Sequence, residues 1–319
     1  MGKTRIAILS AGDEPDLPGL DGIADQVEAV YARDEDTLAR ILPEAEILLV
    51  TDFRTGMLER VWPENHRLDW IHATSAGVDA LMIDPIINSK ITVTNARGIF
   101  DRGIAEYVLG AVLLFAKDTL GNLTYQKREQ WCHRDTEMVH RKHAVIVGAG
   151  SIGSQTADLL RAIGMRVTGV ARSAREDSHF DTVVASKDLP GVLADTDFVV
   201  ITAPLTEQTR GLFDDQMLAH LPAHARLINV GRGPIVKTDS LVRALQAGKL
   251  AGAALDVFEE EPLPAGHPLW QMPNVMISAH MAGDFIGWRR ALGEQFAENF
   301  RRWRNGNSLF NQVKKPPAR

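Results

Sequence analysis

The chain has 319 residues, of which 45% are hydrophobic and 24% charged, a composition typical of globular proteins and a length that favours two domains. Lys and Arg total 35 and Asp and Glu total 41, so the net charge is −6, without the basic excess expected of a nucleic-acid-binding protein. The apolar runs are too short for a membrane span, and the single cysteine, Cys132, excludes an internal disulfide and a cysteine-cluster metal site.

The first apolar run, Ile6–Leu9, is too short and too quickly followed by acidic residues to resemble a secretory signal, so we expect a cytoplasmic protein. From there on, short apolar runs alternate with longer amphipathic segments, which predicts βαβ units with parallel sheets. The strands predicted for a first unit are Arg5–Leu9, Ile47–Val50, Trp70–Ala73 and Ile91–Thr94. Those predicted for a second unit are Ala144–Val147, Arg166–Val170, Thr182–Val184, Phe198–Thr202, Arg226–Val230, Ala251–Val257 and Val275–Ser278.

Helical segments lie between and around these strands. Ser151–Ile163 and Thr238–Gly248 are the clearest helices of the second unit, and Ile104–Phe115, with one apolar face, joins the two units. A C-terminal helix carries an apolar stripe at spacings of three and four residues, from Trp288 to Trp303. This stripe is expected to be core, and the pattern leaves open whether it packs back onto the first unit.

A glycine-rich loop follows the strand that ends at Val147 and precedes the helix Ser151–Ile163. Its sequence fits G-x-G-x-x-G, in which the first glycine permits a tight turn, the second a close backbone approach and the third close helix packing. The N–H groups and the dipole at the helix start favour an anion. We therefore predict a dinucleotide site, the alternatives being a structural glycine turn or another nucleotide-like ligand. The candidate phosphate-binding residues are Gly148, Gly150, Ser151, Ile152 and Gly153.

The turn after the next strand bears on the choice of cofactor. An NAD enzyme normally has an acidic residue there for the ribose hydroxyls, but this turn reads Ala171-Arg172-Ser173-Ala174-Arg175. Two guanidinium groups and a hydroxyl suit a 2′-phosphate instead. The turn thus predicts that NADP(H) is preferred and NAD(H) possible, the alternative being that Arg172 and Arg175 lie on a solvated loop.

Three strand ends of the second unit carry reactive side chains. Of the ten histidines, His72 and His280 end apolar strands, and His280 is the better candidate because it lies in the glycine-loop unit. Arg232 follows a second strand, and the acidic run Glu259–Glu261 follows a third. A histidine can exchange a proton with a carbonyl or alcohol oxygen, a carboxylate can orient it, and an arginine can hold a substrate carboxylate.

These motifs resemble the D-isomer-specific 2-hydroxyacid dehydrogenases, a family that includes glyoxylate/hydroxypyruvate reductases and phosphoglycerate dehydrogenases. The matching segments are Ser75–Asp79, Ile104–Val108, Gly148–Gly153, Asn229–Gly233, Asp256–Pro264 and His280–Gly283. The resemblance implies an α/β fold of two Rossmann-like domains with parallel sheets and an interdomain cleft. Residues 1–100 with 285–319 would be the substrate-binding domain and 101–284 the NAD(P)-binding Rossmann domain.

The resemblance also implies residue roles. Arg232 would bind the substrate carboxylate and carbonyl, Glu261 before Pro262 would be the catalytic glutamate, and His280 the catalytic acid. Glu259 and Glu260 would be solvated neighbours of Glu261. The residues implied in substrate and nicotinamide binding are the backbone of Ala76 and Gly77, and Asp256.

The expected reaction is reduction of a small 2-oxo acid of the glyoxylate or hydroxypyruvate type to the D-2-hydroxy acid, with no metal, nucleic acid or membrane involved. The main alternative is a non-catalytic NAD(P)-sensing regulator of the same fold. A methyltransferase-like nucleotide-binding protein is another. An NAD-dependent oxidoreductase of formate or phosphite is a third, which the missing acid at Ala171 disfavours.

The remaining expectations concern departures from the family and the dimer. Ala279 replaces the proline often found before the catalytic histidine, so the backbone there is less restricted. Asp284 is expected to cap the following helix, or, if it faces the pocket, to disfavour highly anionic substrates. Lys117–Trp131 would be the arm of a homodimer, with Trp131 in an interface or core or reaching the partner's cleft. The loop Thr51–Arg54 could line the substrate pocket or be a surface turn.

Overall fold

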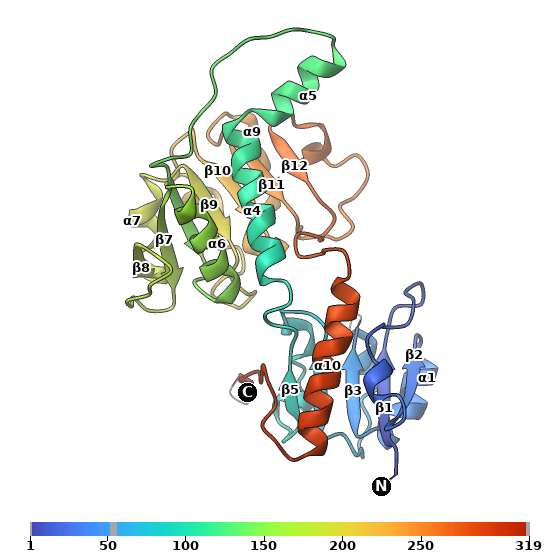
Figure 1. Cartoon of the computed structure of the whole chain (residues 1–319). Helices are drawn as coiled ribbons and strands as arrows, with labels where there is room; N and C mark the ends of the chain where they lie inside the picture. Colours follow the sequence, from blue (N-terminus) through green and yellow to red (C-terminus); the bar gives the residue numbers. More distant parts are fainter. Residues whose placement is uncertain (1, 52–55, 317–319) are drawn as a thin grey trace. The chain divides into compact units, whose positions relative to one another are not determined.

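The computed structural model describes residues 2–51 and 56–316, and the chain divides into two compact units, Met1–Phe100 with Phe285–Arg319 and Asp101–Asp284 (Figure 1). Each unit is built on one parallel sheet, of five strands in the first and seven in the second. The predicted fold class, α/β with two Rossmann-like units and parallel sheets, is confirmed.

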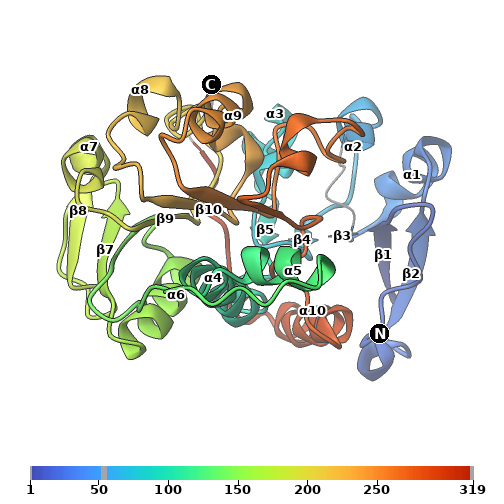
Figure 2. The same cartoon turned by 90° about the horizontal axis from the view of Figure 1, so that it is seen from above.

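The first unit has the strand order β2-β1-β3-β4-β5. Its strands are β1 (Thr4–Leu9), β2 (Val27–Ala32), β3 (Ile47–Val50), β4 (Trp70–Ala73) and β5 (Thr92–Thr94). Its helices are α1 (Glu35–Ile41), α2 (Gly56–Arg60), α3 (Asp84–Ile87) and α10 (Trp288–Arg304). In Figure 2, α10 covers one face of this sheet and α1, α2 and α3 lie on the other.

Alternating side chains of β1 belong to two apolar layers, one on each face of the sheet, as the two-residue period of a strand requires. Ala7 and Leu9 pack on the face of α1, and Ile6 and Ile8 on the face of α10. On the latter face the Phe296 ring of α10 stacks on Trp70, with the ring centroids 5.0 Å apart. The C-terminal stripe is therefore core, and it packs on the first unit.

The second unit has the strand order β12-β11-β10-β9-β6-β7-β8. Its strands are β6 (His143–Val147), β7 (Arg166–Ala171), β8 (Thr182–Ala185), β9 (Phe198–Ile201), β10 (Arg226–Asn229), β11 (Gly252–Leu255) and β12 (Val275–Ile277). Its helices are α4 (Asp101–Ala116), α5 (Thr119–Lys127), α6 (Ser151–Ala162), α7 (Leu189–Leu193), α8 (Asp215–Leu218) and α9 (Thr238–Gln246). Figure 2 shows α4 and α6 on one face and α7, α8 and α9 on the other.

The strand order of the second unit reverses between β6 and β9, which places a topological switch point at the carboxyl ends of these strands. The turns that carry the glycine loop, Arg232, the acidic run and His280 follow β6, β10, β11 and β12. Because all seven strands are parallel, these turns share the carboxyl edge of one sheet.

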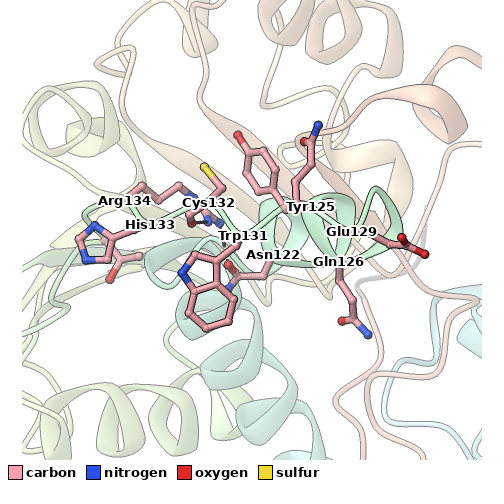
Figure 3. A pocket seen from close by; sticks show the side chains of 10 residues that line it. Asn122, Tyr125, Gln126, Glu129, Trp131, Cys132, His133 and Arg134 are labelled. Atoms are coloured by element: carbon pink, nitrogen blue, oxygen red, sulfur yellow. Dashed lines mark hydrogen bonds between the residues drawn. The ribbon is translucent and has the colours of Figure 1, made fainter.

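Helix α5 and the segment after it leave the body of the second unit as an arm (Figure 1). A hollow of 610 Å³ lies along this arm, lined from α5 and from the returning segment (Figure 3). The Arg134 side chain is part of this lining, donates to Asp118 and Asn122 and lies over the Tyr125 ring. The Trp131 side chain is 100% exposed, so within this chain it is not a core residue.

One strand was absent from the sequence prediction. In β2 only Val27 and Ala32 are buried, because the strand lies at the sheet edge. Its sequence, VEAVYA, therefore lacks the apolar run of the central strands.

In the described part of the chain, none of the helices has the length and apolar character needed to span a membrane.

Candidate active site

The glycine loop joins the buried strand β6 to the twelve-residue helix α6. A Cβ at Gly153 would lie 2.1 Å from the Gly148 carbonyl oxygen, so glycine is needed for α6 to start this close to the loop. Gly150 is the N-cap, and no described side chain caps the helix. The first N–H groups of α6, including those of Ser151 and Ile152, therefore suit an external anion, and the loop fits a dinucleotide pyrophosphate.

The arginine turn after β7 lies against this loop. One Arg175 guanidinium nitrogen donates to the Ala149 carbonyl at 2.7 Å and to the Asp177 carboxylate at 3.0 Å. Arg172 and Ser173 are exposed on the same turn. Arg175 is thus anchored on the glycine loop, which places positive charge beside the predicted adenosine end of the cofactor.

His280 and Glu261 form an ion pair across the ends of β12 and β11. Their Nδ1 and Oε2 atoms are 2.8 Å apart, and the two side chains are 37% and 29% exposed. The other carboxylate oxygen, Oε1, accepts the Phe258 N–H at 2.8 Å. Since an ionised carboxylate only accepts hydrogen bonds, Nδ1 carries a proton, and Nε2 is the ring nitrogen directed away from Glu261.

The electrostatics of the pair favour a charged Glu261. Burial alone would raise the pKa of this carboxyl, but the hydrogen bonds from His280 and Phe258 and the charges of His280 and Arg232 outweigh burial. The pKa of Glu261 is therefore held below its ordinary value. A carboxylate ionised throughout the neutral range can stabilise a protonated imidazole beside it.

Arg232 is presented by a turn that its neighbours fix. The Asn229 side chain accepts the Gly231 N–H at 3.1 Å and donates to the Arg232 carbonyl at 3.2 Å. A Cβ at Gly233 would lie 1.8 Å from the Phe258 carbonyl oxygen, so this glycine lets the turn pack onto the loop that carries Glu261. The structure thus brings Arg232, Glu261 and His280 together on one sheet edge.

Asp256 is 2% exposed at the end of β11. Its carboxylate accepts the N–H groups of Met281 and Ala282, each at 2.9 Å, and the Ser278 hydroxyl at 2.5 Å. These bonds tie Asp256 to the loop that carries His280. Its contact with the nicotinamide amide stays a prediction.

In the first unit, the predicted carboxylate cradle follows β4. The Asn95 side chain donates to the Ala76 carbonyl and the Ser75 hydroxyl to the Gly77 carbonyl, both at 2.6 Å. These two bonds fix the peptide planes of the cradle. Asn95 carried no signal in the sequence, because its contact with Ala76 arises only when β4 and β5 pair.

The prediction that Asp284 caps α10 is wrong: Gly287, in a left-handed conformation, is the N-cap, and α10 begins three residues later than such a cap requires. Glu259 is more than a solvated neighbour, because it accepts the Thr238 N–H at the start of α9. His72 is a core residue with no exposed surface. Residues 52–54 of the predicted pocket loop lie outside the described residues.

Nothing in the described part of the chain gathers three or more potential metal-ligating side chains. The site combines a histidine with a carboxylate partner, an arginine and a glycine loop at a helix N-terminus. Together these residues suit hydride transfer to a carbonyl with protonation of its oxygen.

The chain is similar to known proteins both in sequence and in structure. Residues 109–282 match the NAD binding domain of the D-isomer specific 2-hydroxyacid dehydrogenases. A glyoxylate reductase from Aeropyrum pernix is 32% identical over 79% of this chain and 76% of its own. A D-isomer specific 2-hydroxyacid dehydrogenase from Xanthobacter autotrophicus, solved with NADPH and MES, is 30% identical, with a TM-score of 0.82 over 99% of each chain.

A second solved structure is the NADPH-dependent glyoxylate/hydroxypyruvate reductase from Sinorhizobium meliloti in complex with NADP and sulfate. It is 25% identical, with a TM-score of 0.84 over 98% of this chain and 99% of its own. The matched domain and the extent of these similarities point to the same family. The chain belongs to the D-isomer specific 2-hydroxyacid dehydrogenase family.

Proposed function

We propose that this protein reduces a small 2-oxo acid of the glyoxylate or hydroxypyruvate type to the D-2-hydroxy acid, with NADPH preferred over NADH. The observation that carries the proposal is the His280–Glu261 pair, 2.8 Å apart at the strand ends of the unit that holds the dinucleotide loop. The names of the glyoxylate reductase and of the glyoxylate/hydroxypyruvate reductase among its relatives support the substrate class.

In the proposed reaction, a 2-oxo acid, NADPH and a proton give a 2-hydroxy acid and NADP⁺. The Arg232 guanidinium and the backbone N–H groups of Ala76 and Gly77 hold the substrate carboxylate, and Arg232 also polarises the carbonyl. When bound, the reduced nicotinamide supplies the hydride to C2. His280 donates the Nε2 proton to the carbonyl oxygen as it gains negative charge, and Glu261 orients the ring and stabilises its charged form.

The preference for NADPH is supported by the arginine turn. Arg175 is fixed against the glycine loop, and Arg172 and Ser173 lie exposed beside it. A guanidinium can bind a phosphate through two parallel hydrogen bonds, whereas the ribose hydroxyls of NADH would meet no carboxylate at Ala171. The solved relatives that contain NADPH or NADP are consistent with this choice.

We further propose a homodimer formed through the arm, in the cytoplasm where reduced dinucleotide is regenerated. The arm exposes Leu123, Trp131 and Met138, three large apolar side chains that an interface would cover. Light scattering coupled to size-exclusion chromatography tests the dimer. A monomer at micromolar concentration would contradict it.

The direct experiment is a screen of 2-oxo acids with NADPH and NADH, followed by the loss of reduced-cofactor absorbance. We expect turnover of glyoxylate or hydroxypyruvate, a higher kcat/KM with NADPH, and the D-enantiomer as product where the product is chiral. Binding of NADPH without turnover of any 2-oxo acid would refute the proposal and favour a cofactor-sensing regulator.

A further inference from the structure

A chain of three polar side chains runs behind the His280 loop. The Ser278 hydroxyl, just after β12, donates to Asp256 at 2.5 Å, and the Tyr107 phenol of α4 lies 2.6 Å from the same hydroxyl. The chain thus links α4, β12 and β11. Neither Ser278 nor Tyr107 belongs to the residues placed above in substrate, cofactor or proton transfer.

Chemistry fixes the direction of these hydrogen bonds. The Asp256 carboxylate can only accept hydrogen bonds, so Ser278 donates its one hydroxyl proton to Asp256. Tyr107 must then donate to Ser278. Burial raises the pKa of the Tyr107 phenol and the Asp256 charge adds to this rise, while the Ser278 hydrogen bond opposes it. The net rise keeps the phenol protonated, as a donor must be.

This chain of hydrogen bonds ends at the backbone around His280, which has an unusual conformation. His280 has φ +53°, in the left-handed region that a residue with a Cβ rarely adopts. The His280 N–H donates to the Asp256 carbonyl at 2.8 Å, and the next two N–H groups donate to the Asp256 carboxylate. Ala279, where the family often has proline, leaves its own φ unrestricted.

Helix α4 also contacts the far end of this loop. A Cβ at Gly103 would lie 3.0 Å from the Gly283 carbonyl oxygen, so the helix backbone lies directly on the H-x-x-G segment. The same helix therefore contacts the loop through Gly103 and the strand end through Tyr107. Both contacts lie within one unit.

We propose that Tyr107 and Ser278 are positioning residues for the reduction: through Asp256 they hold the His280 loop in its left-handed conformation and so aim Nε2 at the substrate oxygen. The inference rests on the proposed function for its kinetic consequence but not for its structural one. A catalytic group displaced by about 1 Å can lose about 100-fold in rate. Loss of one link should therefore lower kcat more than substrate or cofactor binding.

The test compares five variants of the 319-residue chain. Ser278→Ala and Tyr107→Phe remove one hydroxyl each from the chain. Ser240→Ala is the matched serine control, because Ser240 is buried and donates to Asp215 at 2.9 Å away from the site. Tyr31→Phe is the matched tyrosine control, because its half-buried phenol accepts the Leu17 N–H at 2.9 Å in the other unit.

We expect kcat to fall about 10- to 100-fold in Ser278→Ala and about 3- to 10-fold in Tyr107→Phe, with the Kd for NADPH unchanged. The primary isotope effect with C4-deuterated NADPH should rise, since hydride transfer becomes slower than product release. The conservative variant Ser278→Thr, which keeps the hydroxyl, should retain kcat. Both controls should match the wild type.

Hydrogen exchange supplies a readout that does not depend on activity. The amides of Met281 and Ala282 should exchange faster in Ser278→Ala and Tyr107→Phe than in either control. If the wild type turns over no 2-oxo acid but exchange still rises, the proposed function fails and the positioning of the loop stands. Unchanged kcat and exchange in both variants, or weaker NADPH binding at unchanged kcat, would overturn the inference.

Discussion

Acid should destabilise the first unit through one buried histidine. His72 lies in β4 with no exposed surface, against the rings of both Trp70 and Phe296, and its Nδ1 lies 2.8 Å from the Thr94 hydroxyl. Its Nε2 has no hydrogen-bond partner among the described residues. Burial lowers the pKa of His72 from 6.5 to about 3. The unfolded chain therefore takes up this proton at a higher pH than the folded chain.

The sign and size of the effect follow from this difference. As the pH falls below the pKa of His72 in the unfolded chain, the unfolded state binds a proton that the folded state does not bind, so the free energy of unfolding decreases. Each pH unit in that range is worth about 1.4 kcal/mol. Between about pH 7 and pH 5, His72 alone should remove about 2 kcal/mol, and the loss should continue until the folded state also takes up the proton near pH 3.

Urea unfolding at both pH values measures this loss, with tryptophan fluorescence as the probe because Trp70 is buried beside His72. His72→Phe removes the titrating ring, and Thr94 still accepts the Trp70 indole N–H at 2.7 Å. Each protein is compared with itself, so a packing change in the variant cancels. His72→Gln is a second neutral variant. If wild type and variants lose equal stability between the two pH values, the reasoning is wrong.

Three further predictions concern the site. Glu261→Gln should lower kcat about 10- to 100-fold, because the amide cannot orient and stabilise the His280 imidazole as the carboxylate does; a kcat equal to that of the wild type would argue against the pairing. Arg175→Glu should lower kcat/KM for NADPH at least about tenfold and spare NADH, since it replaces the cation on the glycine loop with an anion; equal losses with both cofactors would contradict a 2′-phosphate site. Burial and the Asp256 charge raise the pKa of Asp284, and the His280 charge opposes this rise. Because the Asp284 carboxyl interacts electrostatically with His280, Asp284→Asn should raise kcat/KM for a dianionic substrate such as oxaloacetate about 3- to 10-fold relative to glyoxylate; an unchanged ratio would show that this charge does not act on substrates.

Local patterns predicted the parts of the fold that local physics determines. The central strands are apolar runs because both their faces are covered. The glycine loop can be recognised in the sequence because close backbone approaches set the spacing of its glycines. The edge strand β2, buried only at Val27 and Ala32, has no such run. The capping rule selected Asp284 by residue type, but a left-handed glycine, Gly287, starts α10 instead.

The site could be predicted where motifs mark it and not where tertiary contacts create it. Arg232, Glu261 and His280 stand in segments that resemble a known family, and the structure brings their side chains together. Tyr107 and Ser278 are 171 residues apart and meet only because α4 packs on the second sheet. No periodicity in the sequence relates a helix position to a strand end at such a separation.

The most direct test of the account is single-turnover reduction of glyoxylate by NADPH in His280→Gln and in the wild type. Removal of a positioned acid should slow hydride transfer about 10²- to 10⁴-fold, while NADPH still quenches tryptophan fluorescence with the wild-type Kd, because the glycine loop is untouched. A His280→Gln protein that reduces glyoxylate at the wild-type rate would contradict the assignment of this histidine as the proton donor.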